Sequence, residues 1–121
     1  DNHEIFKRAE ENLYYELPIS FTDAALGSSV EVPSIDGGKS KIKIPAGTQH
    51  GKQFRLKGKG MPILRRNLFG DLYIRINTQV PNFLSKRQKE ILEEFSAIEK
   101  NKPDPIIKNF FEKAKKFWRG S

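Results

Sequence analysis

The sequence predicts a mainly β fold: an antiparallel β-sandwich with a short internal helix, followed by two C-terminal helices. Three observations lead to this prediction. Apolar and polar residues alternate in several short segments of the first 81 residues, as in strands that bury one face. Glycine-rich turn signals separate these segments. Beyond residue 81 the apolar residues recur at helical spacing, and two prolines divide that region.

The N-terminal part of the chain contains the first strand candidate. Residues 1–10 mix charged residues with a few apolar ones, and we expect a leading segment whose Phe6 docks on the body of the domain. Residues 12–20 are rich in Tyr and Leu, which favours a strand. Proline has no backbone N–H, so Pro18 indicates that this strand lies at an edge or carries a bulge.

A short helical turn and a hairpin follow. Residues 22–27 predict one turn of helix, with Thr22 as its N-cap and Gly27 as its C-terminal stop. Residues 28–35 alternate like a strand, and the Asp-Gly-Gly at 36–38 is typical of a hairpin turn.

Three further strands are predicted before the spacing of the apolar residues changes from that of strands to that of helices. Residues 39–45 place Ile42 and Ile44 on one face, and residues 53–58 alternate in the same way. The glycines between these two segments predict a turn rather than a phosphate-binding loop, because no Ser or Thr follows the Gly-Lys pair and no helix opens there. Residues 71–81 form the longest strand candidate.

The region after residue 81 predicts two helices. Ser85 and Gln88 have the spacing of a capping box, which marks the start of the first helix. The segment 101–105 contains two prolines and predicts a hinge. The second helix carries an apolar face made of Ile106, Ile107, Phe110, Phe111, Ala114, Phe117 and Trp118, with its basic residues mostly elsewhere.

An apolar face of this size is not expected to stay in water. It could pack on its own domain, pair with a second subunit or lie on a membrane surface. The two prolines favour a helix that swings away from the body, and therefore a partner subunit. We accordingly expect two domains: 1–99, the sandwich with a closing helix, and 100–121, the proline hinge with an amphipathic dimerisation helix.

Composition limits the classes of function. The chain has 121 residues, no cysteine and a net charge of +7, most of which lies beyond residue 99. Disulfides and cysteine-ligated zinc are therefore excluded. No apolar run approaches the length of a membrane span. The chain begins with Asp and has a single methionine, Met61, so we expect a fragment or a processed form.

No catalytic constellation is visible. Neither His3 nor His50 has a second histidine or a carboxylate at metal-ligand spacing. Phe54 beside Arg55 would suit a nucleic-acid surface, but Phe54 shares its face with Leu56, which indicates a core position. We therefore expect no enzyme. A basic nucleic-acid-binding module and a membrane module anchored by the last helix remain alternatives.

The order of motifs resembles one family. His3, Phe6 and Arg8 precede Asn-Leu at 12–13 and PISFTDAALG at 18–27. KIPAGTQHGKQFRLKGKGMP, GDLYIRI and VPNFLSKRQKEILEEF follow in the same order. This pattern resembles the second C-terminal β-domain of DnaJ-type J-domain co-chaperones, over residues 3–96. The family commonly has Asp-Gly or Asn-Gly after the arginine, whereas this chain has Ala9 and Glu10 there.

The resemblance implies a role in protein folding and the stress response. It implies binding of non-native polypeptide, and a C-terminal helix that joins two subunits. A client would add beside the short helix and an exposed strand. The candidate peptide-binding residues are Phe21, Leu26, Val30, Val32 and Ile35. The candidate dimerisation residues are Ile106, Ile107, Phe110, Phe111, Phe117 and Trp118.

The resemblance also implies partners that act outside this segment. The J domain and the cysteine-rich zinc region of the family are absent, so we expect no cofactor in this fragment. A DnaK-type chaperone would be reached through parts of the parent chain that are not present. We expect a cytoplasmic homodimer that binds unfolded clients and neither nucleic acid nor membrane.

Overall fold

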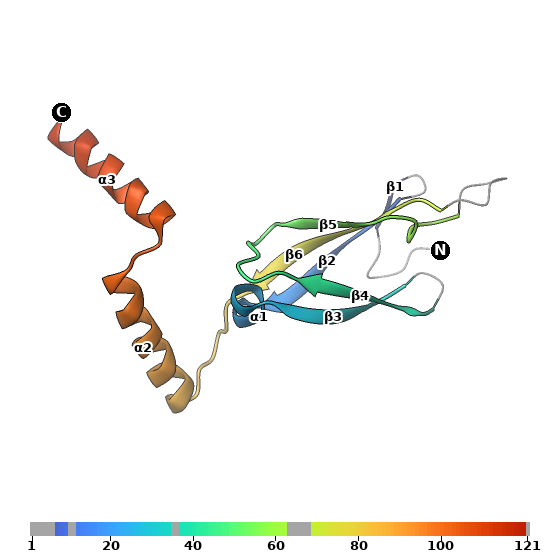
Figure 1. The fold of residues 1–121 in the computed structure, drawn as a ribbon, viewed down its shortest axis with the longest axis horizontal. Helices are drawn as coiled ribbons and strands as arrows, with labels where there is room; N and C mark the ends of the chain where they lie inside the picture. Colours follow the sequence, from blue (N-terminus) through green and yellow to red (C-terminus); the bar gives the residue numbers. More distant parts are fainter. Residues whose placement is uncertain (1–6, 10–11, 35–36, 63–68, 121) are drawn as a thin grey trace. The chain divides into compact units, whose positions relative to one another are not determined.

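The computed structural model describes residues 7–9, 12–34, 37–62 and 69–120. The chain separates into two compact units after Pro81. The first unit contains β1 (Lys7–Ala9), β2 (Asn12–Ser20), α1 (Phe21–Leu26), β3 (Ser28–Pro33), β4 (Lys39–Ile44), β5 (Gln53–Leu56) and β6 (Leu72–Gln79), and the second contains α2 (Lys86–Asn101) and α3 (Pro105–Arg119) (Figure 1).

The first unit is the predicted sandwich. A four-stranded sheet has the order β1-β2-β6-β5, and β3 and β4 form a two-stranded sheet. Among the described strands, the pairs β1–β2, β5–β6 and β3–β4 are antiparallel, which confirms the fold class. The central pair β2–β6 is parallel, with a register from Leu13↔Leu72 to Ser20↔Gln79. This parallel pair was not predicted, because alternation along a strand specifies neither its partner nor its direction.

The core lies between the two sheets, and the alternation seen in the sequence supplies it. Strands β2, β4 and β6 bury alternate side chains, as pleated strands with one covered face do. The side chains of Ile74 and Ile76 on β6 are 0% exposed. The buried hydrophobic residues are Leu13, Tyr15, Ile19, Ala24, Val32, Ile42, Ile44, Leu72, Ile74 and Ile76.

The N-cap of helix α1 lies two residues earlier than the sequence predicted. Ser20, not Thr22, is the N-cap: its Oγ accepts a hydrogen bond from the backbone N–H of Asp23 at 3.1 Å. The prediction of Thr22 was wrong because Ser20 already has the extended backbone of a cap, and Thr22 instead lies within 3.1 Å of the Ser20 hydroxyl. Gly27 ends the helix as predicted, with a φ of 88°. A Cβ there would lie 3.0 Å from the backbone nitrogen of Ala46, so glycine is required.

Two turns fix the ends of the small sheet. The β3–β4 hairpin closes where the Asp-Gly-Gly signal predicted, and the backbone N–H of Ser34 donates to the carbonyl of Gly38 at 2.8 Å. Beyond β4, the N–H of Gly47 donates to the carbonyl of Ala24 at 2.9 Å, which ties the turn to α1. Phe6 and Ile35, for which the sequence made predictions, lie outside the described residues.

The second unit consists of α2 and α3. The predicted capping box is present: the Ser85 hydroxyl accepts from the N–H of Gln88, and the Gln88 side chain accepts from the N–H of Ser85. At the hinge, the Asp104 carboxylate accepts from the N–H of Ile106 at 2.8 Å, and Pro105 is the first helical residue. The sequence placed the domain boundary at residue 99, whereas the chain divides after Pro81, so α2 groups with α3.

Candidate functional site

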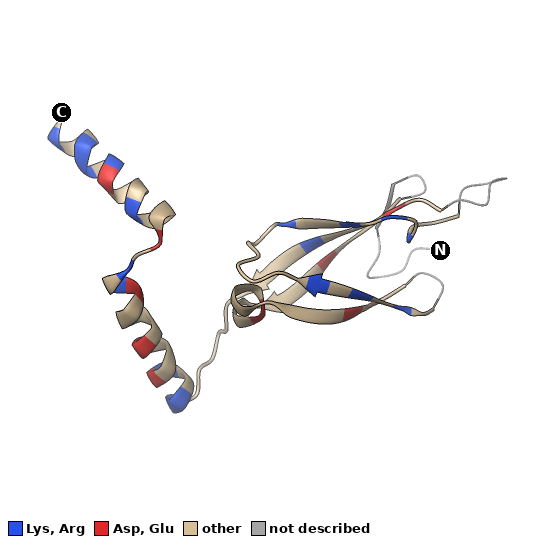
Figure 2. Ribbon diagram, viewed as in Figure 1, with Lys and Arg blue, Asp and Glu red and all other residues tan. Residues whose placement is uncertain are grey.

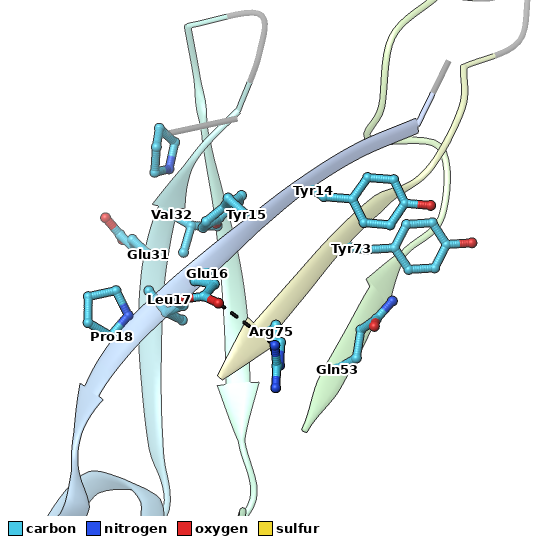
Figure 3. Close-up of a pocket in the computed structure, with 11 residues that line it drawn as sticks. Tyr14, Tyr15, Glu16, Leu17, Pro18, Glu31, Val32, Gln53, Tyr73 and Arg75 are labelled. Atoms are coloured by element: carbon cyan, nitrogen blue, oxygen red, sulfur yellow. Dashed lines mark ion pairs between the residues drawn. The ribbon is translucent and has the colours of Figure 1, made fainter. Parts of the chain in front are cut away.

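A groove opens on the first unit where the two sheets meet at β2 and β3. Its volume is about 620 Å³, large enough for several side chains. We call it the tyrosine groove (Figure 3). It is lined from β2 by Tyr14, Tyr15, Glu16, Leu17 and Pro18, from β3 by Glu31, Val32 and Pro33, from β5 by Gln53, and from β6 by Tyr73 and Arg75.

Two stacked tyrosines form the most prominent feature of this groove. The rings of Tyr14 and Tyr73 are nearly parallel, with an interplanar angle of 10° and 4.9 Å between centroids. They lie side by side in Figure 3 because the parallel register of β2 and β6 places these two residues opposite each other. The stack presents a flat apolar surface bordered by hydroxyls, which suits contact with apolar or amphipathic side chains.

One ion pair places two opposite charges in the groove and so adds no net charge to it. Arg75 Nη1 lies 3.9 Å from Glu16 Oε1, and both side chains are 58% exposed. Asn77 Nδ2 donates to the other oxygen of Glu16 at 3.3 Å. An exposed pair of this kind contributes little to binding, so the apolar surface dominates the groove.

The strand edges beside the groove are open among the described residues. β1 pairs with β2 only from Asn12 to Tyr14, and β3 pairs only with β4. The groove therefore lies between two strand edges, where an extended polypeptide could align its backbone. Pro18 lies beyond the part of β2 that pairs with β1, which agrees with the prediction of an edge or a bulge there.

Of the four predicted peptide-binding residues that the structure describes, one, Val32, lies in the tyrosine groove. Val32 lines the tyrosine groove, but it is only 2% exposed and belongs mainly to the core. Val30 is half-buried against the core, Phe21 is half-buried, and Leu26 on α1 is 80% exposed. Ile35 lies outside the described residues.

Sequence reasoning missed the tyrosines and Arg75. The signal that could have found them is the outward position of Tyr14 in the alternation of β2, and of Tyr73 in that of β6. Their meeting depends on the parallel pairing of strands separated by more than 50 residues, which no local pattern shows.

The predicted dimerisation residues all lie on α3 and are exposed. At about 100° per residue, they and Ala114 span an arc of about 140°, and the lysines and the arginine of α3 lie outside this arc. The Phe110 and Phe111 rings meet edge to face with centroids 5.2 Å apart. The exposed members of this face, the α3 apolar face, are Ile106, Ile107, Phe110, Phe111, Phe117 and Trp118.

Titratable groups give little sign of catalytic chemistry in the described part of the chain. His50 accepts a hydrogen bond at Nδ1 from the backbone N–H of Thr78 at 3.0 Å, which ties its turn to β6. Burial raises the pKa of Tyr15 to about 12, so its phenol stays protonated at neutral pH. Within the described ranges, no three His, Cys, Asp or Glu side chains gather as metal ligands would.

Comparison with known proteins identifies the family of both units. Residues 1–81 match the family described as DnaJ C terminal domain, and residues 87–120 match the Chaperone protein DnaJ C-terminal region. The division between the two matches agrees with the division after Pro81.

Curated relatives match almost the whole chain. The chain is 61% identical over 118 residues to the chaperone protein DnaJ of Pelagibacter ubique, and 51% identical over 118 residues to those of Brucella canis and Brucella suis. Each alignment covers 98% of this chain and 31% of the relative, so the chain spans about a third of the length of these proteins.

Proposed function

This chain belongs to the family of DnaJ C-terminal domains, and from that membership we propose that it is a non-catalytic co-chaperone segment. In this proposal the segment binds non-native polypeptide and joins two copies of its parent chain. The observation that carries the proposal is the tyrosine groove, an apolar surface set between open strand edges.

The tyrosine groove is proposed to hold an extended, apolar stretch of a client. The stacked rings of Tyr14 and Tyr73 offer a contact that tolerates many side chains, because a flat apolar face needs no specific hydrogen bond. Among the described strands β3 pairs only with β4, so its other edge offers backbone groups to a strand laid beside it. Such a site would favour unfolded chains, since folded proteins rarely expose an extended apolar segment.

The α3 apolar face is proposed to pair with the same face of a second copy. In a two-fold pairing, each apolar residue is buried on both helices, while the lysines and the arginine of α3 stay in water. The dimer would then present two tyrosine grooves to one client, and linked sites bind a long chain more tightly than either site alone.

Delivery to a DnaK-type chaperone is proposed to depend on other parts of the parent chain. We propose a cytoplasmic location, no cofactor in this segment, and no binding of nucleic acid or membrane. Among the described helices, none has the length and apolarity needed to span a bilayer.

A binding measurement tests the client proposal. A fluorescent, permanently unfolded polypeptide is titrated with the full chain, and anisotropy reports the affinity. Replacing both Tyr14 and Tyr73 by Ala should weaken binding about tenfold or more, because each exposed aromatic contact contributes about 1 kcal/mol. Phe83→Ala is the matched control, since Phe83 is an exposed aromatic that lines neither the groove nor the α3 apolar face.

The outcomes distinguish binding at the tyrosine groove from nonspecific binding to exposed aromatic residues. Equal losses of affinity in the double variant and in Phe83→Ala would mean that the polypeptide binds to any exposed aromatic residue. No loss in the double variant would reject the tyrosine groove as the client site. Circular dichroism of both proteins checks that the sandwich remains folded.

A further inference from the structure

A second groove lies on the first unit between β4, β5 and the turn after β5. We call it the basic groove. Its lining residues are Lys39, Ser40, Lys41, Arg55, Leu56, Lys57 and Lys59, and none of them lines the tyrosine groove. Five of the seven are cationic and none is acidic. Figure 2 shows lysine and arginine on β4, on β5 and on the turn that follows β5.

This concentration of charge is local. Residues 1–99 carry 15 lysines and arginines against 13 acidic residues, a net charge of only +2. The basic groove gathers a third of those cations into one place. Such a concentration costs stability through repulsion between like charges, which a bound anionic partner would relieve.

Arg55, on one side of the basic groove, is held in place by an acidic residue, Asp71, that does not line the groove. Asp71 Oδ2 accepts from Arg55 Nε at 2.6 Å and lies 2.6 Å from Nη2, while Oδ1 accepts from the N–H of Gly58 at 3.0 Å. Gly58 adopts a φ of 76°, which brings this N–H to the carboxylate. Arg55 is therefore positioned before any ligand arrives, and no ion pair with Nη1 appears in the described part of the chain.

The other cations are less engaged. Lys39 Nζ lies 3.7 Å from Glu31 Oε2, and both side chains are more than 60% exposed, so this pair is weak. Lys41, Lys57 and Lys59 form no ion pair within the described ranges. The groove thus keeps most of its positive charge available.

The arrangement matches the repeat of an extended polypeptide. Lys39 and Lys41 alternate with buried residues on β4, so they share one face at a spacing of about 7 Å. A strand laid along β4 would repeat its side chains at the same interval, and opposite charges directly across strands attract. Among the described strands β4 pairs only with β3, and β5 is the last strand of its sheet, so both are edges.

The lining disfavours a single-stranded nucleic acid. Proteins that bind single strands stack bases on aromatic side chains, and the basic groove has none. From these observations we propose that the basic groove binds an extended polypeptide segment with acidic side chains at alternating positions. This binding is independent of the tyrosine groove and of the proposed client function.

The test uses the full chain and a labelled peptide in which glutamate alternates with threonine. A peptide with glutamine in place of glutamate is the charge control. Lys41→Glu combined with Lys59→Glu should weaken binding about tenfold or more at low salt, because each change removes an attraction and adds a repulsion. The matched control replaces Lys113 and Lys116 on α3 by Glu and should change affinity less than about twofold.

Each outcome decides the proposal. Binding that depends on glutamate and on the basic groove supports it, provided that Tyr14→Ala with Tyr73→Ala leaves that binding unchanged. Equal losses in the α3 variant would show general charge attraction and overturn it. Tighter binding of a single-stranded oligonucleotide of the same charge would also overturn it, in favour of phosphate recognition.

A third outcome concerns aggregation. Lysine on an exposed edge strand commonly prevents edge-to-edge association. If the groove variant aggregates and the milder pair Lys41→Gln with Lys59→Gln stays soluble and binds the glutamate peptide like the original chain, edge protection is the role and the proposal fails. If this milder pair is folded and binds about threefold more weakly, the proposal stands.

Discussion

The dimer proposal makes a quantitative prediction for Phe110→Ala. Phe110 is 64% exposed, and a phenylalanine side chain can bury about 150–250 Å². Pairing of the α3 apolar face would therefore remove about 130 Å² of this side chain from water. At about 25 cal/mol per Å², that burial contributes about 3 kcal/mol for each subunit.

Alanine would retain about a third of this area, so each subunit loses about 2 kcal/mol. A two-fold dimer contains the substitution twice, which makes the total about 4 kcal/mol. Because about 1.4 kcal/mol corresponds to a factor of ten, the dimer dissociation constant should rise about a thousandfold. Alanine is the best helix former, so loss of the dimer could not be attributed to melting of α3.

Sedimentation equilibrium over a range of concentrations measures this constant for the original chain, for Phe110→Ala and for Lys108→Ala. Lys108 lies on the polar side of α3, so its replacement should leave the constant within about threefold. An unchanged dimer in Phe110→Ala would refute the assignment of this face.

A monomeric original chain would also reject the dimer, and a second measurement then separates the alternatives. Gain of helix and a shift of Trp118 emission on anionic vesicles would favour a membrane surface. No response to vesicles would favour packing on its own domain. A version ending at Glu99 should behave as a folded monomer if α3 is the only contact.

Three further predictions concern the sandwich. Ile74→Ala should lower the free energy of unfolding by about 2–5 kcal/mol in urea titrations, because Ile74 is fully buried, whereas Leu26→Ala at an exposed site should change it by less than about 0.5 kcal/mol. Hydrogen bonds from the N–H of Gly58 and from Arg55 hold the pKa of Asp71 below its ordinary value of 3.8. The stability that Asp71 provides is therefore complete above pH 3.8 and is lost as the pH falls through the lower pKa of the folded state. Asp71→Asn should flatten this part of an acid denaturation curve. Burial raises the pKa of Tyr15 from 10.0 to about 12, so stability should be complete below pH 10 and fall between these two values, with one tyrosinate absorbing later than the others in an alkaline titration.

Local patterns predicted the elements of this chain well. The period of two in residues 39–45 placed Ile42 and Ile44 in the core, where both are buried. The spacing of Ser85 and Gln88 predicted the start of α2, and both hydrogen bonds of the capping box are present. These successes share a cause: each depends on residues within one turn or one strand of each other.

The features that sequence reasoning missed depend on distant residues or on competition between neighbours. The stack of Tyr14 on Tyr73 requires the parallel register of β2 and β6. The N-cap of α1 went to Ser20 rather than Thr22 because β2 runs directly into the helix and leaves Ser20 in an extended conformation. Alternation along a strand places Tyr14 and Tyr73 on outward faces but does not show that they meet. Cap preferences accept both Ser20 and Thr22 and therefore do not choose between them.

The position of Pro18 limits how the tyrosine groove can recognise a chain. The N–H of Leu13 donates to the carbonyl of Asp71, so the odd-numbered residues of β2 direct their backbone groups toward β6. Glu16 and Pro18 therefore face the open edge, and proline has no N–H to donate. A strand added there would gain few hydrogen bonds from β2. Affinity would then depend mainly on the stacked tyrosines and the apolar floor of the groove, contacts that discriminate weakly between sequences and so suit a site that must accept many unfolded chains.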